Sequence, residues 1–172
     1  MSRDPEPAGR SGIDALRDAA GHLDRDALLK VLPYGEDFLF VDRVTRLESG
    51  VTEGSFTVPP DAPFLRSHFR DLPVMPGALI AEGWAQTGTL LVRYHLERPE
   101  TKTVVGMQIE RTRFDGAVAP GDSLRYVVRL AALDSRAARL EGEALTERGR
   151  VAKLKVVVGI VDTRVFRARL GG

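Results

Sequence analysis

Cysteine is absent from the 172 residues of the sequence. Disulfide bonds, thiolate metal sites and a cysteine nucleophile are therefore excluded, and a reducing cytoplasm is compatible with this composition. An excess of one charge is absent too, because 25 Lys and Arg residues nearly balance 24 Asp and Glu residues. A chain with so little net charge has no large basic field to attract nucleic acid. We expect a cytoplasmic protein that does not bind nucleic acid.

Long apolar runs are also missing. The most apolar stretch, residues 74–96, is interrupted by Glu82 and Gln86, so it predicts a buried helix and not a membrane span. Residues 1–22 mix proline, glycine and charged residues and lack the apolar segment of a secretory signal. We expect residues 1–22 to form a flexible tail and residues 23–172 to form one domain of ordinary size. No membrane partner is expected.

Turn and cap signals divide the chain into short elements. A helix is predicted from its N-cap residue Asp24 to Pro33, and a hairpin of two strands is predicted around Ser49-Gly50. A proline-rich loop over residues 59–76 precedes a helical period over residues 77–96. Four more strands are predicted at residues 101–114, 123–135, 137–147 and 150–161. One long helix among about six antiparallel strands predicts an α+β fold in which a curved sheet wraps the helix.

One face of the predicted long helix is polar. Glu82, Gln86, Thr89 and Arg93 follow one another at spacings of four, three and four residues, which places them in one stripe on an otherwise apolar helix. A single helical glutamate is usually solvated, and a single loop histidine such as His68 is usually satisfied by backbone groups or water. Taken one at a time, these residues predict no active site.

The segment from His68 to Gln86 changes that interpretation. It reads H-F-R-D-L-P-V-M-P-G-A-L-I-A-E-G-W-A-Q. It resembles the signature of hotdog-fold 3-hydroxyacyl-acyl carrier protein dehydratases, which reads roughly G-H-F-P-G-x-P-V-M-P-G-V-L-x-x-E-A-x-A-Q. Flanking blocks extend the resemblance: Leu32-Pro33 with F-L-F-V-D-R at residues 38–43, and R-F with V-A-P-G-D within residues 113–122. The resemblance runs from about residue 32 into the final strands and implies a hotdog fold.

The resemblance implies a role for four residues. His68 occupies the position of the family's catalytic histidine, and Glu82 occupies that of its catalytic acid. Gly77 would donate its backbone N–H to the thioester carbonyl, and Gln86 would support the acid. Apart from these four, Phe69 is a candidate substrate-binding residue in the acyl tunnel. The implied reaction removes water from a (3R)-3-hydroxyacyl thioester in fatty-acid or related acyl-chain synthesis, with His68 removing a proton from C2 and Glu82 protonating the departing C3 hydroxyl.

The family also implies partners. Its two catalytic residues come from different subunits, so we expect a homodimer or a trimer of dimers, with no metal and no redox cofactor. The substrate would be carried as a thioester of acyl carrier protein or of coenzyme A. Trp84 and Met107 are further candidates for the acyl tunnel. Four arginines are candidates for contact with an acidic carrier protein or a phosphopantetheine phosphate, although surface arginines are usually only solvated: Arg66, Arg70, Arg111 and Arg113.

Three positions depart from the family pattern and keep alternatives open. Ser67 replaces a glycine, Arg70-Asp71 replaces Pro-Gly, and Tyr34-Gly35 replaces His-Arg. The same fold hosts thioesterases and hydratases of coenzyme A esters, as well as dehydratases that also isomerise the double bond. A non-catalytic acyl-binding partner subunit is another alternative. The intact pair of His68 and Glu82 favours dehydration over hydrolysis and over a non-catalytic subunit. Glu82 also argues against isomerisation, since the isomerising relatives carry aspartate at the acid position.

Overall fold

The computed structural model of the protein describes residues 9–171. Three short 3-10 turns, at Glu36–Phe38, Pro63–Arg66 and Pro99–Thr101, connect the larger elements. These larger elements are, in order, α1 (Gly9–Asp14), β1 (Leu23–Asp24), α2 (Arg25–Val31), β2 (Arg43–Leu47), β3 (Val51–Thr57), α3 (Gly77–His95), β4 (Lys102–Phe114), β5 (Ser123–Leu133), β6 (Ala137–Thr146), β7 (Gly149–Asp162) and α4 (Thr163–Leu170).

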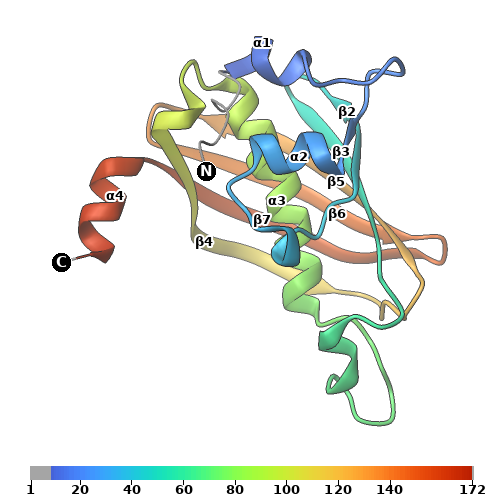
Figure 1. Ribbon diagram of the computed structural model, residues 1–172. Coiled ribbons are helices and arrows are strands. Elements are labelled where there is room, and N and C mark those ends of the chain that lie inside the picture. Colours follow the sequence, from blue (N-terminus) through green and yellow to red (C-terminus); the bar gives the residue numbers. More distant parts are fainter. Residues whose placement is uncertain (1–8, 172) are drawn as a thin grey trace.

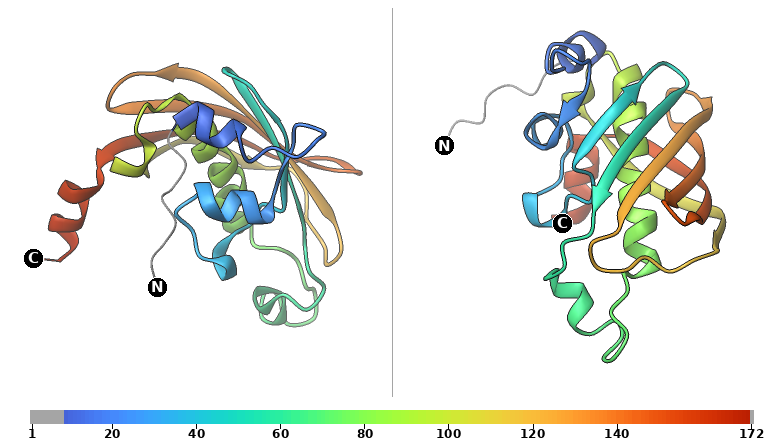
Figure 2. Two further views of the ribbon diagram at one scale, coloured as in Figure 1. Left: turned by 45° about the horizontal axis from the view of Figure 1, so that its top comes forward. Right: turned by 90° about the vertical axis from the view of Figure 1, so that its right-hand side faces the viewer.

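The strands form one antiparallel sheet in the order β1-β2-β3-β5-β6-β7-β4. The sheet curves around α3, and α2 lies on the side of α3 that faces away from the sheet (Figures 1 and 2). The predicted α+β layout is therefore confirmed, with seven strands instead of about six because the two-residue β1 extends one edge. The chain leaves α3 and crosses to the opposite edge, so β4 is an edge strand.

The long helix forms as its flanking residues predict. It begins at Gly77 directly after Pro76 and ends at His95, with Pro99 shortly beyond. Proline at the mouth of a helix removes an N–H that would have no partner in the helix. Helix α2 likewise begins after the predicted N-cap, because the Asp24 side chain accepts a hydrogen bond from the Ala27 N–H at 2.9 Å.

The core lies between α3 and the concave face of the sheet. Trp84 is fully buried there, and its indole N–H donates to the Val127 carbonyl at 2.9 Å. Trp84 was a candidate for the acyl tunnel, but the structure gives it a structural role between helix and sheet. Gly83 allows this close packing, since a Cβ atom at that position would lie 2.3 Å from the Tyr126 hydroxyl and 2.7 Å from the Phe40 carbonyl oxygen.

The two ends of the described chain carry helices that the sequence patterns do not predict. Residues 9–22 were expected in the flexible tail, yet α1 packs on α3 through the fully buried Ile13, and the Tyr94 hydroxyl donates to Asp14 at 3.0 Å. The rest of the predicted tail, residues 1–8, lies outside the described residues. At the other end, α4 begins after Asp162, which caps it, and projects away from the sheet (Figures 1 and 2).

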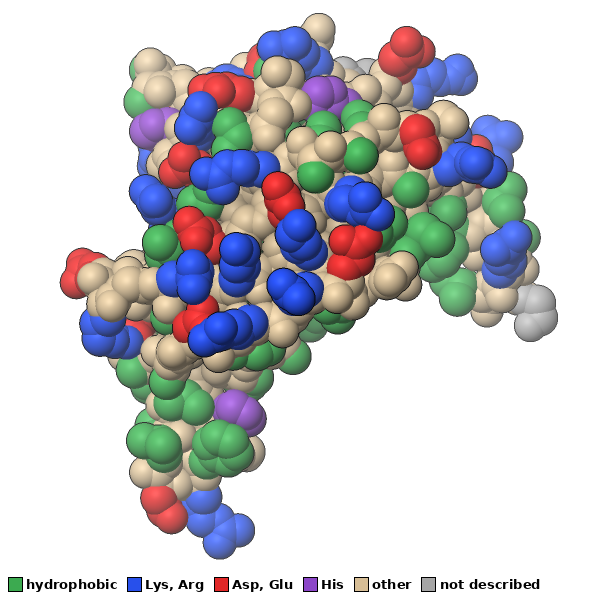
Figure 3. Space-filling view, turned by 180° about the vertical axis from the view of Figure 1, so that it is seen from behind, with side chains coloured by type: hydrophobic (Ala, Val, Ile, Leu, Met, Phe, Trp, Pro, Cys, Tyr) green, Lys and Arg blue, Asp and Glu red, His purple; other side chains and the backbone are tan. Residues whose placement is uncertain are grey.

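Both signs of charge are mixed on the convex face of the sheet, which is the face turned away from α3 (Figure 3). Lys155 and Glu141 form one ion pair of this face, with 3.0 Å between nitrogen and oxygen. Within residues 9–171, no helix has the length and apolar character needed to cross a membrane.

Candidate active site

The loop over residues 59–76 carries the candidate base. It projects from the domain beyond the N-terminal end of α3, and apolar side chains gather on the projection (Figures 1 and 3). Phe69 and Leu72 contribute to this apolar surface, being 58% and 64% exposed. Phe69, the predicted acyl-binding residue, thus lies on the surface of the projection and stacks on the ring of His68, with 4.3 Å between ring centres.

His68 is held by Val74 at both its backbone and its ring. The Val74 N–H donates to the His68 carbonyl at 2.9 Å, and the His68 Nδ1 atom lies 3.0 Å from the Val74 carbonyl oxygen. A carbonyl oxygen can only accept, so Nδ1 carries the proton and Nε2 presents a lone pair. Within residues 9–171, Nε2 has no hydrogen-bond partner. This partly buried imidazole is therefore set up to accept a proton through Nε2.

Glu82 lies in the second turn of α3 and is held through one oxygen. The Gln86 amide nitrogen donates to Glu82 Oε1 at 3.0 Å and to the Phe38 carbonyl at 2.8 Å. The Gln86 amide oxygen accepts from the Phe40 N–H at 2.9 Å, which fixes the orientation of the amide. Gln86 is fully buried and Glu82 is partly buried. The second carboxyl oxygen of Glu82 has no partner within residues 9–171, so it is available to a ligand.

Tyr34 is a residue near this stripe for which the sequence patterns predict no role. Burial raises the pKa of its hydroxyl, the hydrogen bond from Thr89 lowers it, and the charge of Glu82 raises it. Tyr34 therefore lies over the polar stripe of α3 as a neutral side chain. One sign in the sequence marks Tyr34 as unusual: it stands where the family pattern has histidine.

Gly77 begins α3 and faces Phe114 at the end of β4. A Cβ atom on Gly77 would lie 3.0 Å from two ring carbons of Phe114, so the ring lies directly against the glycine. The Gly77 N–H has no hydrogen-bond partner within the described residues, as expected for the first residue of a helix. The N-terminal end of a helix attracts negative charge. An oxygen that gains negative charge could bind here.

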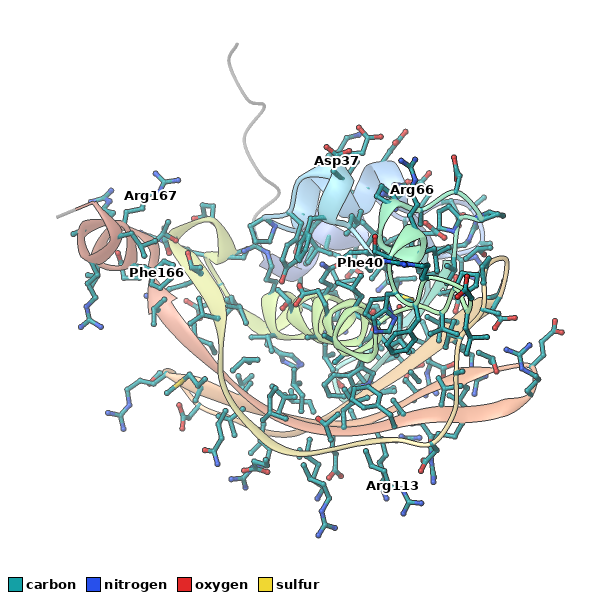
Figure 4. The ribbon with its side chains drawn as sticks, turned by 90° about the horizontal axis from the view of Figure 1, so that it is seen from below. Asp37, Phe40, Arg66, Arg113, Phe166 and Arg167 are labelled. Atoms are coloured by element: carbon teal, nitrogen blue, oxygen red, sulfur yellow. The ribbon has the colours of Figure 1, made fainter. Side chains whose placement is uncertain are left out.

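Other predicted residues lie apart from this region. Met107 is 67% exposed on the edge strand β4. Figure 4 shows Arg113 on the side of the sheet away from α3, where it pairs with Asp115. Within residues 9–171, no hydrogen bond joins His68 to Glu82, and no group of three or more His, Asp or Glu side chains could hold a metal ion. Within the described chain, the candidate base and the candidate acid are therefore not joined directly.

A protein-family model and curated relatives both match most of this chain. The chain matches the model of the FabA-like domain family over residues 32–155. It is 34% identical over 140 residues to the 3-hydroxyacyl-(acyl-carrier-protein) dehydratase FabZ of Solibacter usitatus, and this match covers 81% of the chain and 86% of the relative.

Solved structures with low sequence identity support the fold. The dehydratase heterocomplex ApeI:P from Xenorhabdus doucetiae is similar with a TM-score of 0.69 at 16% identity, covering 82% of this chain and 95% of that one. A hot-dog-like protein from Thermanaerovibrio acidaminovorans is similar with a TM-score of 0.60 at 17% identity, covering 72% of this chain and 90% of that one. The predicted hotdog fold is confirmed.

Proposed function

Because the chain belongs to the FabA-like family of 3-hydroxyacyl-(acyl-carrier-protein) dehydratases, we propose that it removes water from (3R)-3-hydroxyacyl thioesters to give trans-2-enoyl thioesters. The reaction serves fatty-acid or related acyl-chain synthesis. One observation supports the proposal beyond family membership. The side chains of the proposed base and the proposed acid each have one polar atom in a hydrogen bond, and each has a second polar atom without a partner in the described chain. His68 is held through Nδ1, and Glu82 is held through Oε1.

The proposed elimination uses these two free atoms. The lone pair on His68 Nε2 takes a proton from C2 of the substrate, and the electrons of that C–H bond form the C2–C3 double bond. The C3–O bond breaks, and protonated Glu82 gives its proton to the departing hydroxyl, which leaves as water. During proton removal the thioester oxygen gains negative charge. The Gly77 N–H at the start of α3 donates to that oxygen.

The same proposal includes a dimer, because His68 and Glu82 of one chain are not joined. Strand β4 offers an open sheet edge that exposes Met107 and Ile109, which are 67% and 68% exposed. An edge with such side chains is suited to pairing with a second copy. The projecting loop of each copy would then bring its His68 to the partner's Glu82. Dimers of this kind could assemble further into a trimer of dimers.

The proposed substrate is a thioester of acyl carrier protein, the carrier named for the FabZ relative from Solibacter usitatus. Coenzyme A thioesters share the same phosphopantetheine arm and are the second carrier to test. Arg66 and Arg70 are exposed on the projecting loop, where they can meet an acidic carrier or a phosphate. A cytoplasmic location remains a prediction.

The test compares dehydration of a short (3R)-3-hydroxyacyl thioester on each carrier by the wild type, His68→Ala and Glu82→Gln. Formation of the enoyl thioester is followed directly, and thiol release is followed in parallel. His95→Ala and Glu97→Gln serve as matched controls, because both side chains are exposed at the far end of α3. We expect enoyl product from the wild type and both controls, and a loss in both site variants. Thiol release without enoyl product would instead indicate a thioesterase, and no turnover would indicate a binding subunit.

A further inference from the structure

Thr112 lies two residues before Phe114 on β4, and both side chains face α3. In the pairing of β4 with β7, Thr112 is opposite Leu154 and Phe114 is opposite Ala152. Directly opposed residues of an antiparallel pair project to the same face of the sheet. Leu154 and Ala152 are buried at 1% and 0% exposure, so this is the inner face.

The contact between Phe114 and Gly77 locates this face relative to the candidate active site. The Phe114 ring lies against Gly77, whose N–H is the proposed donor to the thioester oxygen. Residues two apart on a strand are separated by about 7 Å along it. Thr112 is therefore one side-chain position further along the wall that faces the start of α3.

The hydroxyl of Thr112 is buried and has no hydrogen-bond partner within residues 9–171. Buried hydroxyl groups without partners are rare in folded proteins, because the chain loses the hydrogen bonds that water provided. Valine has the same shape without this loss, so a core position of this kind does not require threonine. Tyr126 also has an unpaired buried hydroxyl, but it lies in the closed core against Gly83. Thr112 instead lies on an edge strand and is only partly buried as a residue.

We propose that the Thr112 hydroxyl is a second hydrogen-bond donor to the thioester oxygen of the bound substrate, beside the Gly77 N–H. This inference rests on the proposed function. The ring of Phe114, the neighbouring residue on this face, is 48% exposed, so it can turn away from Gly77 when a ligand enters. A donor aimed at an oxygen that gains charge acts mainly in the transition state.

Thr112→Val and Thr112→Ser test the proposal, with Thr103→Val as the matched control. Thr103 lies on the same strand, but its hydroxyl is hydrogen-bonded to the Thr163 hydroxyl at 3.0 Å. We expect Thr112→Val to lower kcat by about 10- to 100-fold with little change in KM, between the effect of an ordinary hydrogen bond and that of an oxyanion donor. Its Tm should equal or exceed that of the wild type, because an unpaired buried hydroxyl is removed.

The other two variants should behave in the opposite way. Thr112→Ser keeps the hydroxyl and should retain most of the wild-type kcat, whereas Thr103→Val should keep kcat and lose some thermal stability. If the wild type is active and Thr112→Val has the same kcat, the inference is overturned and the dehydratase proposal stays intact. A weakened dimer in Thr112→Val, with activity restored at high protein concentration, would overturn it in favour of a bond between subunits. An inactive wild type would count against the proposed function. Thr112→Ala replaces the valine variant if the latter does not fold.

Discussion

Gln86 joins the candidate acid to the loop before β2, so its replacement should affect stability and catalysis together. Its amide makes three hydrogen bonds, to Glu82 Oε1, the Phe38 carbonyl and the Phe40 N–H. Gln86→Leu keeps a side chain of similar size and removes all three. The Phe40 N–H would then be left without a partner in the core, since Phe40 is only 7% exposed. Phe38 is 49% exposed, so water can reach its carbonyl.

The expected loss of stability in Gln86→Leu comes from the Phe40 N–H and the Phe38 carbonyl. A buried group that loses its partner costs about 1–3 kcal/mol, and the more exposed carbonyl adds less. We expect Gln86→Leu to lower the free energy of unfolding by about 2–3 kcal/mol. For a protein of this size, that corresponds to a fall in Tm of roughly 4–12 °C. The measurement is urea unfolding at a fixed protein concentration, because the stability of the proposed dimer would depend on concentration.

Thr87→Val is the matched control for this prediction. Thr87 is as buried as Gln86, but its hydroxyl donates only to the Gly83 carbonyl within the same helix, at 2.9 Å. Removing the Thr87 hydroxyl leaves no backbone group without a partner, because the Gly83 carbonyl still accepts the helical hydrogen bond from the N–H four residues later. Gln86→Leu should also lower kcat, because Glu82 loses its fixed orientation. If the free energies of unfolding of the two variants agree within about 0.5 kcal/mol, the hydrogen bonds of Gln86 to the backbone do not stabilise the protein.

Two further predictions concern packing and acid stability. Gly83→Ala should destabilise the protein by about 1–2 kcal/mol despite better helix propensity, because its Cβ would meet the Phe40 carbonyl oxygen at 2.7 Å. Gly88→Ala in the same helix meets side-chain methyl groups of Leu140 and Val128 and no backbone atom, and it should remain within about 1 kcal/mol of the wild type in urea unfolding. The hydrogen bond from Arg148 holds the pKa of Asp122 in the folded protein below its usual range. The ionised Asp122 carboxylate therefore stabilises the folded protein above the pKa that Asp122 has in the unfolded chain. This stabilisation is lost as the pH falls through the pKa of Asp122 in the folded protein. Asp122→Asn should therefore be less stable than the wild type at pH 7, and the difference should shrink below about pH 4 in urea titrations at several pH values.

Local signals explain which parts of the fold could be predicted. The long helix was expected over residues 77–96 and spans Gly77–His95, because proline residues mark both of its ends. The last four strands agree with their expected limits within about two residues, since each is bounded by turn residues. Helix α4 was missed because its eight residues follow a strand without a break. Strand β1 was missed because two residues carry no alternating pattern.

Contacts between distant segments explain what the sequence could not predict about the site. The spacing of Glu82 and Gln86 predicted that they share a helix face, and the structure joins them by a hydrogen bond. The bonds of Gln86 to Phe38 and Phe40 cross more than 40 residues of sequence, and no spacing indicates them. The position of Tyr34 over the same stripe is likewise a tertiary contact.

In the proposed dimer, each acid/base site takes His68 from one copy and Glu82 from the other. Mixed dimers of His68→Ala and Glu82→Gln distinguish this arrangement from sites within one chain, since each mixed dimer would contain one intact site. After joint refolding of equal amounts, we expect dehydration at about a quarter of the wild-type rate, because random pairing makes half of the dimers mixed and each mixed dimer has one of its two sites intact. Each variant refolded alone should be inactive. If the mixture is as inactive as the separate variants, although the dimers are shown to exchange subunits, His68 and Glu82 do not act together across the dimer.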